Sequence, residues 1–183
     1  MLENFPDHKI LEICQSPDSK NYGFSLLINK YQKQVYWLIR RMVIDHDDAD
    51  DLVQETFIKV WKNLETFRSE SGLYTWIYRI AVNESLSYLK LKKLKYAFLV
   101  QNFDHALARK IEDDNYFSGD EIQLKLQKAI LSLPGKQRLV FNLRYYEELK
   151  YEDMSQMLGT SVGALKASYH IAVKKVEEFL TNN

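Results

Sequence analysis

The amino-acid sequence predicts an all-α protein made of two small helical domains joined by a flexible linker, with a helix-turn-helix as the C-terminal domain. Apolar residues recur every three or four positions through most of the chain, which is the period of one helix face. The six glycines and three prolines fall where helices would end, Gly23 among them. Over residues 97–120 this periodicity weakens and acidic residues gather, so we place a linker there, with room for a short helix, between domains at 1–96 and 121–183.

Three helices are expected in the first domain. Apolar stripes over residues 24–42 and 74–94 predict the first and the third. A stripe over residues 49–64 predicts the second, and Asp47 is placed to cap it. Four more helices are expected in the second domain, over residues 122–131, 137–146, 151–158 and 162–180.

Composition and cysteine content narrow the class of protein. Hydrophobic residues make up 46% of the 183 residues and charged residues 27%, enough apolar surface for packed cores. The single Cys14 cannot form an internal disulfide, and neither a signal sequence nor an apolar run of about 18 residues is evident. We therefore expect a cytoplasmic protein with no membrane insertion.

The net charge is zero, but it is unevenly distributed. Residues 24–100 carry +3 and residues 121–183 carry +2, whereas residues 1–23 carry −2 and residues 101–120 carry −3. Two mildly basic bodies with acidic connectors are compatible with nucleic-acid binding, although the charge is too small for strong binding by the free chain.

Residues 151–176 have the spacing of a helix-turn-helix. Gly159 suits the left-handed residue that ends the first helix, and Ser161 suits the N-cap of the second. One face of the second helix is apolar and the other is small or basic, as in a helix that enters a DNA groove. The residues expected to face DNA are Gly163, Lys166, Ala167, His170 and Lys174. An ordinary helical hairpin with a solvated polar face is the alternative.

The predicted helix over residues 49–64 has a polar face opposite its apolar stripe. Asp51, Gln54 and Glu55 lie on it with Ile58 among them, a pattern that fits a partner carrying arginines, although a solvated face fits too. The aspartates that precede this face lack the spacing and the glycine of a calcium loop, so we expect no metal and no cofactor.

Aromatic and basic residues alternate over residues 67–79, and lysines follow at 90–95. Aromatic rings can stack on unpaired bases, at about 1–3 kcal/mol per base, while lysines hold the backbone. The alternative is that Trp76 and its apolar neighbours Ile77 and Ile80 are simply core.

The order of these features resembles the extracytoplasmic-function sigma factors over nearly the whole chain. Residues 50–61 resemble the region that binds the clamp coiled coil of RNA polymerase, residues 67–81 the promoter-melting region, and residues 133–176 the region that reads the minus-thirty-five element. The resemblance implies three partners: core RNA polymerase, through its clamp coiled coil and flap, promoter DNA, and in some circumstances an anti-sigma factor. It implies promoter recognition, DNA melting and transcription initiation as the function.

The resemblance also assigns residues. Those assigned to polymerase binding are Asp50, Asp51, Gln54, Glu55, Ile58 and Trp61. Those assigned to minus-ten DNA are Phe67, Arg68, Ser69, Tyr74, Trp76, Arg79, Asn83, Lys90, Lys92 and Lys93. Those assigned to minus-thirty-five DNA are Arg144, Ser161, Gly163, Ala164, Lys166, Ala167, His170 and Lys174. Where many family members have arginines, this chain has Ser168, Ile171 and Val173, so the family's DNA sequence preference does not carry over.

Two other classes of protein compete with this prediction. A two-domain transcription regulator would share the helix-turn-helix, but it would bind operator duplex unaided. An enzyme would need a phosphate-binding loop, a dinucleotide loop, a metal-ligand set or a nucleophile elbow, and the sequence contains none of these motifs. We therefore expect a protein that is not an enzyme.

Overall fold

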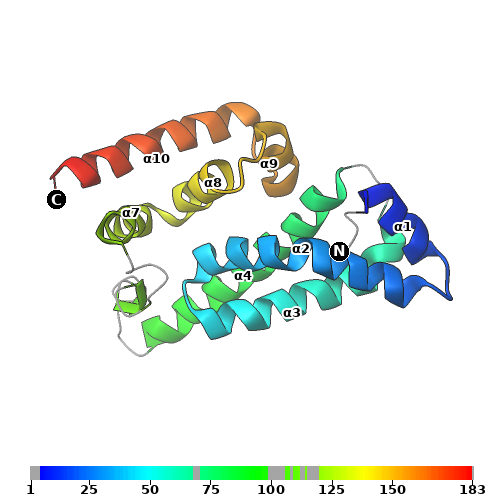
Figure 1. The fold of residues 1–183 in the computed structure, drawn as a ribbon. Coiled ribbons are helices and arrows are strands. Elements are labelled where there is room, and N and C mark those ends of the chain that lie inside the picture. Colours follow the sequence, from blue (N-terminus) through cyan, green and yellow to red (C-terminus); the bar gives the residue numbers. More distant parts are fainter. Residues whose placement is uncertain are drawn as a thin grey trace.

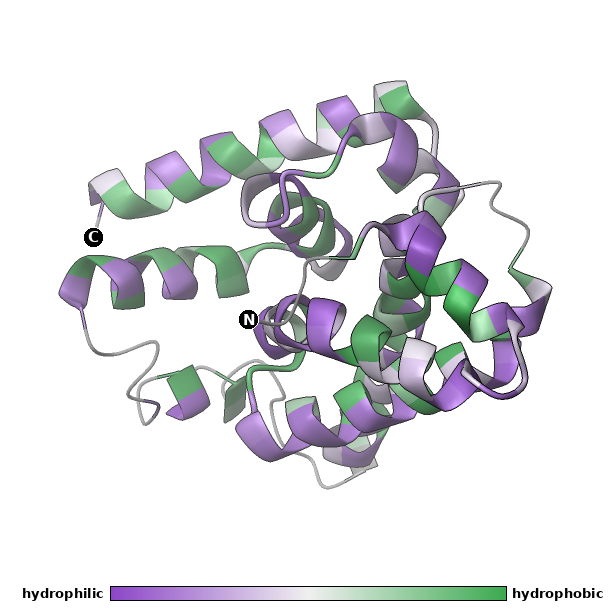
Figure 2. Cartoon of the chain, turned by 45° about the vertical axis from the view of Figure 1, so that its right-hand side comes forward, coloured by the Kyte–Doolittle hydropathy of each residue, from purple (hydrophilic) through white to green (hydrophobic). Residues whose placement is uncertain are grey.

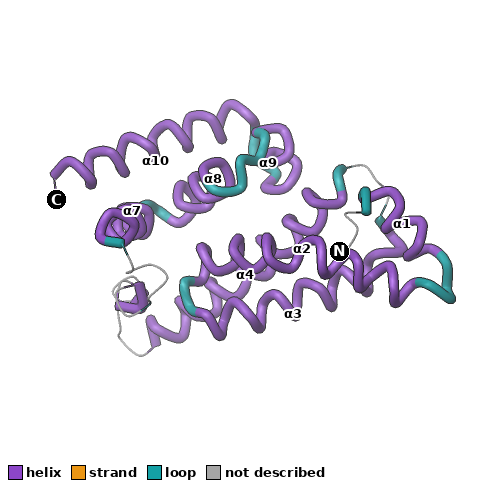
Figure 3. The backbone as a smooth tube through the Cα atoms, in the orientation of Figure 1, coloured by secondary structure: helices purple, strands orange, loops and turns teal. Residues whose placement is uncertain are grey.

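The computed structural model describes residues 5–67, 71–98, 106–107, 109–111, 114 and 120–182. Within those residues the regular structure is helical and no strand is present (Figure 3). None of the described helices is long and apolar enough to cross a membrane.

The N-terminal body is built around three long helices that lie side by side (Figure 1). Its elements are α1 (Asp7–Gln15), α2 (Lys20–Val43), α3 (His46–Asn63), the short 3₁₀ helix η1 (Leu64–Thr66) and α4 (Leu73–Phe98). α2 packs against α1, α3 and α4, and α3 packs against α4. Val35, Val60 and Ile77 are fully buried between them, so the predicted apolar stripes do form this core.

Gly23 lies inside α2, not at a helix end as its residue type predicted. The periodicity had placed the start of this helix near Phe24, and it gave no indication of α1. A Cβ atom on Gly23 would lie 2.7 Å from Sγ and 2.8 Å from the backbone nitrogen of Cys14. The glycine is therefore explained by the close approach of α1.

The C-terminal body consists of four helices, as predicted: α7 (Glu121–Ser132), α8 (Gly135–Tyr145), α9 (Tyr151–Leu158) and α10 (Val162–Asn182). α10 packs against the other three. Ala129 and Ile130 of α7, Phe141 of α8, and Ala172 and Val176 of α10 are buried together. Hydrophilic and hydrophobic residues alternate along these helices, as expected where one face is buried (Figure 2).

The turn between α9 and α10 has the predicted geometry. Gly159 adopts the left-handed conformation, with φ of 61°, and ends α9. The Ser161 hydroxyl accepts a hydrogen bond from the Ala164 backbone N–H at 3.3 Å, which caps α10.

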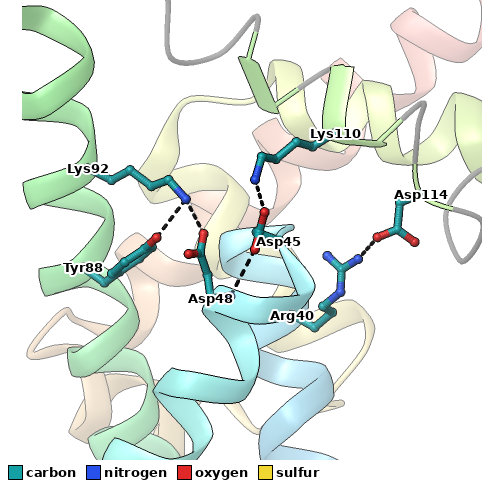
Figure 4. Close-up of polar contacts among 7 residues, drawn as sticks. All are labelled: Arg40, Asp45, Asp48, Tyr88, Lys92, Lys110 and Asp114. Atoms are coloured by element: carbon teal, nitrogen blue, oxygen red, sulfur yellow. Dashed lines mark hydrogen bonds and ion pairs between the residues drawn. The ribbon is translucent and has the colours of Figure 1, made fainter.

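The described residues between the two bodies are anchored to both. Leu107 and Ile111 are buried with Ile44 of the N-terminal body and Leu131 of α7. Lys110 pairs with Asp45, and the buried Arg40 pairs with Asp114 (Figure 4). Residues 106–107 and 109–111 are helical, in the segment where the sequence left room for a short helix.

The two bodies also pack directly against each other. α4 contacts α9, and α2 contacts α8. Leu143, Met154 and Met157 of the C-terminal body belong to the same buried cluster as Leu38 and Ile77 of the N-terminal body. The apolar core is therefore continuous across the junction.

Candidate protein and nucleic-acid interfaces

The face of α3 that points away from the core is polar and exposed. Asp50, Asp51, Gln54 and Glu55 are all exposed, and Ile58 is 45% exposed among them. The opposite face, with Ala49, Leu52, Thr56 and Val60, is buried because it packs against α2 and α4. The result is an acidic surface with an apolar side chain at its centre, as the sequence predicted.

Trp61, predicted for the same surface, lies in a different environment. Its ring packs edge-on against Phe24 with centroids 4.8 Å apart, and the Lys20 ammonium lies 4.6 Å from its centre. Lys20 also pairs with Glu65. Trp61 is thus half-buried and joins α3 to α2, with only part of the ring available to a partner.

The first turn of α3 is capped by Asp45, not by Asp47 as predicted. The Asp45 carboxylate accepts a hydrogen bond from the Asp48 backbone N–H at 3.0 Å (Figure 4). Asp47 is exposed and is the second residue of α3, where its charge can only complement the helix dipole. Among the described residues, no cluster of three or more potential ligands could hold a metal ion.

The aromatic residues predicted to stack on bases pack in pairs. Phe67 and Trp76 have ring centroids 5.0 Å apart, and both are half-buried. The ring centroids of Tyr74 and Tyr78 are 4.0 Å apart. Burial raises the pKa of Tyr74 to about 12. The predicted Arg68 and Ser69 lie outside the described residues. The structure thus supports core packing for these rings, since all three pack on the core. Phe67, Tyr74 and Trp76 nevertheless retain some exposure, so stacking on bases stays a prediction.

The other polar residues of α4 that were predicted to contact DNA fall into two groups. Asn83, Lys90 and Lys93 are exposed, and Arg79 is half-buried. Lys92 is different, because its ammonium pairs with Asp48 of α3 and donates a hydrogen bond to the Tyr88 hydroxyl at 2.8 Å (Figure 4).

The polar face of α10 is open. The predicted residues on it are all exposed: Ser161, Gly163, Ala164, Lys166, Ala167, His170 and Lys174. The Lys166 ammonium lies 5.7 Å from the Tyr151 ring centre, at the start of α9. A helix N-terminus with small residues and exposed cations can approach a phosphate backbone closely.

Arg144, also predicted to contact DNA, binds its own chain. Its guanidinium donates hydrogen bonds to the carbonyl oxygens of Glu148, at 3.3 Å, and Leu149, at 3.0 Å. It also lies 5.2 Å from the centre of the Tyr151 ring. Arg144 therefore holds the turn that leads into α9.

A cleft of about 1260 Å³ is lined by residues of both bodies. Lys90 and Lys93 of α4 line it, as do Ala164 and Ser168 of α10. Lys136 and Arg138 add positive charge, and leucines from both bodies make it largely apolar. Residues predicted for the two separate DNA surfaces thus line one cleft.

Sequence reasoning did not single out the polar cluster of Arg41, Tyr78 and Glu147, which crosses the junction between the bodies. Arg41 Nη1 donates to Glu147 Oε1 at 2.6 Å, and the Tyr78 hydroxyl donates to Glu147 Oε2 at 2.9 Å. Burial raises the pKa of Glu147 by more than the hydrogen bond from Tyr78 and the charge of Arg41 lower it. Burial and the neighbouring carboxylate also raise the pKa of Tyr78. No local sequence pattern could indicate this cluster, since its members lie far apart in the chain.

Comparison with known proteins identifies the family. Residues 27–94 match Sigma-70 region 2, and residues 123–176 match Sigma-70, region 4. The ECF RNA polymerase sigma-E factor of Haemophilus influenzae is 32% identical over 97% of this chain and 96% of its own. The RNA polymerase sigma-H factor of Pseudomonas aeruginosa is 32% identical over 98% and 96%, respectively. The chain therefore belongs to the extracytoplasmic-function sigma factors, which direct promoter recognition and transcription initiation by RNA polymerase.

Two solved structures share the fold. The sigma factor RpoE in complex with the anti-sigma factor NepR, from Bartonella quintana, has a TM-score of 0.66 and 22% identity, covering 86% of this chain and 96% of that one. CnrH in complex with the cytosolic domain of CnrY has a TM-score of 0.68 and 20% identity, covering 97% of this chain and 99% of that one. These similarities confirm the predicted all-α fold with two helical bodies.

Proposed function

We propose that residues 1–96 bind the polymerase clamp and open the minus-ten element, that residues 121–183 read the minus-thirty-five element, and that residues 97–120 join them. The observation that carries this division is the exposed acidic face of α3. It belongs to the matched Sigma-70 region 2, whereas the helix-turn-helix belongs to the matched region 4. On this proposal the chain is a cytoplasmic binding subunit without enzymatic activity of its own.

The α3 face has the chemistry of a docking surface for a basic partner. Asp50, Asp51 and Glu55 supply negative charge, and the exposed Ile58 supplies apolar area that a partner can cover. Complementary charge favours encounter, while a covered apolar centre contributes affinity. Gln54 adds a hydrogen-bonding group to the same face, and the half-buried Trp61 follows Ile58 by three residues on the same helix.

The minus-ten surface lies along α4 in this proposal. Asn83, Lys90 and Lys93 are exposed and can contact the strand directly. Phe67 and Trp76 would have to separate before a base could enter between them, because their rings already touch.

The minus-thirty-five surface is the N-terminal half of α10. Gly163, Ala164 and Ala167 allow close approach to base edges, while Lys166, His170 and Lys174 can donate to bases or phosphates. Arg144 contributes by positioning α9.

An anti-sigma factor is the third proposed partner. The cleft between the two bodies combines apolar walls with Lys90, Lys93, Lys136 and Arg138. An amphipathic segment with acidic residues matches it in charge and polarity. One structure of similar fold is of a sigma factor, RpoE, bound to the anti-sigma factor NepR.

Run-off transcription with core RNA polymerase on a promoter library tests the function. We expect promoter-specific transcripts that depend on the chain. Operator-like duplex binding by the free chain, with no promoter-specific transcript, would instead indicate a two-domain regulator.

A pull-down with core RNA polymerase tests the α3 face. Glu55→Arg should reduce core binding by at least about tenfold, because it places a cation against the basic residues proposed on the polymerase. Glu12→Arg, the same charge change on the exposed surface of α1, is the control and should bind core normally.

A further inference from the structure

We propose that Arg41, Tyr78 and Glu147 form an interdomain latch that holds the chain closed, in an arrangement that cannot read both promoter elements. Arg41 lies on α2 and Tyr78 on α4, both in the N-terminal body, whereas Glu147 follows α8 in the C-terminal body. Both oxygens of the Glu147 carboxylate accept hydrogen bonds across the junction. The latch is therefore complete only when the two bodies are packed together.

The surroundings of the latch make it sensitive to the loss of one member. The side chain of Glu147 is 9% exposed and that of Arg41 is 17% exposed, while Tyr78 is fully buried. The Arg41 guanidinium lies 4.4 Å from the Tyr146 ring centre, and Asn142 donates a hydrogen bond to the Arg41 carbonyl at 3.4 Å. A buried carboxylate that loses its partner is strongly unfavourable.

Apolar contacts across the junction cannot by themselves fix one relative arrangement of the two bodies. Met154, Met157 and Leu143 pack in the shared core, but apolar burial is not directional and permits shifted arrangements. The hydrogen bonds from Arg41 and Tyr78 to the two Glu147 oxygens are directional, and they are satisfied in one register only. We infer that they select the closed arrangement among other ways in which the two bodies could meet.

The closed arrangement is inactive for a geometric reason, which rests on the proposed assignment of the two DNA surfaces. The minus-ten and minus-thirty-five elements are about 25 base pairs apart, or about 85 Å along B-DNA at roughly 3.4 Å per base pair. Lys90 and Lys93 line the same cleft as Ala164, so a part of each surface borders one cleft when the two bodies are packed together. The bodies must separate, and the latch must break, before both elements can be contacted.

Small-angle X-ray scattering of the free full-length chain tests the latch without polymerase or DNA. The wild type should have a radius of gyration near the roughly 16 Å expected for a compact chain of this length. Arg41→Glu and Glu147→Arg should each increase it, because like charges then oppose each other at the junction. The double variant R41E/E147R restores opposite charges and should return to the compact value.

Two controls separate opening from unfolding. Glu148→Arg makes the same charge change on the exposed neighbouring residue and should stay compact. Circular dichroism on the same samples should show unchanged helicity, and Tyr78→Phe, which removes one hydrogen bond and keeps the ring, should expand the chain less than either reversal. An expanded wild type, compact single variants, or a double variant that stays expanded would each overturn the latch. Because no polymerase is present, these outcomes are independent of whether transcription is observed.

Discussion

At the scale of single residues, Lys92 differs from its neighbours Lys90 and Lys93 in what its ammonium contacts. Burial lowers the pKa of Lys92, but the hydrogen bonds and charge of Asp48 and Tyr88 raise it by more. Lys92 is therefore a cation that joins α3 to α4, whereas Lys90 and Lys93 remain exposed. The sequence predicted all three as DNA contacts because a lysine run does not reveal which side chain faces a carboxylate.

Gly23 offers a test at the same scale. Replacing it with Ala should lower the free energy of unfolding by about 1 kcal/mol, because overpacking against Cys14 costs about 1–3 kcal/mol and the gain in helix propensity is only about 1 kcal/mol. Urea unfolding followed by circular dichroism measures the change. Gly135→Ala is the matched control, since its added Cβ would meet nothing within 4 Å and should leave stability unchanged or slightly higher. Equal stability of the two variants would contradict the explanation of Gly23.

At the scale of elements, helix boundaries depend on which acceptor reaches the free backbone N–H groups. Asp45, Asp47 and Asp48 are all chemically suited to cap α3, so sequence alone could not choose between them. Asp45 has extended backbone geometry, with ψ of 134°, and its carboxylate reaches the Asp48 N–H. The periodicity located α3 correctly within a few residues, while the cap depended on the path of the chain leaving α2.

The capping role predicts unequal effects for two aspartates. Asp45→Ala should lower the free energy of unfolding by about 1 kcal/mol and accelerate amide exchange at Asp48, because the cap is lost. Asp47→Ala should cost only about 0.3 kcal/mol, since an exposed charge in the first turn acts through the helix dipole alone. Hydrogen exchange and urea titration of both variants provide the comparison. A larger loss for Asp47→Ala would show that Asp45 is not the cap.

At the scale of the whole molecule, one buried cluster extends from α2 and α4 into α8, α9 and α10. The two matched regions could each be predicted as a separate helical body, and both are present. Their packing against each other brings Lys90 and Lys93 of one proposed promoter surface and Ala164 of the other to one cleft. Regulation of such a chain can therefore act on the packing of its bodies without altering either DNA surface.

The buried Glu147 predicts a pH dependence of this packing. Its pKa is raised in the closed arrangement by burial and returns towards the ordinary 4.5 when the bodies separate. The closed arrangement should therefore be most stable below that ordinary value and lose stability as pH rises through the raised pKa. Tyr78 and Tyr74 stay neutral over this range because their pKa values are raised.

Scattering measured from pH 4.5 upward should show the radius of gyration increasing with pH. Glu147→Gln, which imitates the protonated carboxyl in size and hydrogen bonding, should stay compact and lose this part of the pH dependence. A pH response that persists unchanged in Glu147→Gln would assign it to another group.

The sequence by itself determined the three long helices of the N-terminal body, the four helices of the C-terminal body, the helix-turn-helix with Gly159 and Ser161, and the exposed acidic face of α3. These features depend on local spacing, capping and turn chemistry, which a few neighbouring residues encode. Only the tertiary structure decided that Lys92, Arg144 and Trp61 are engaged within the chain. It alone brought Arg41, Tyr78 and Glu147 together, because contacts between residues 69 and 106 positions apart arise from packing and leave no local pattern.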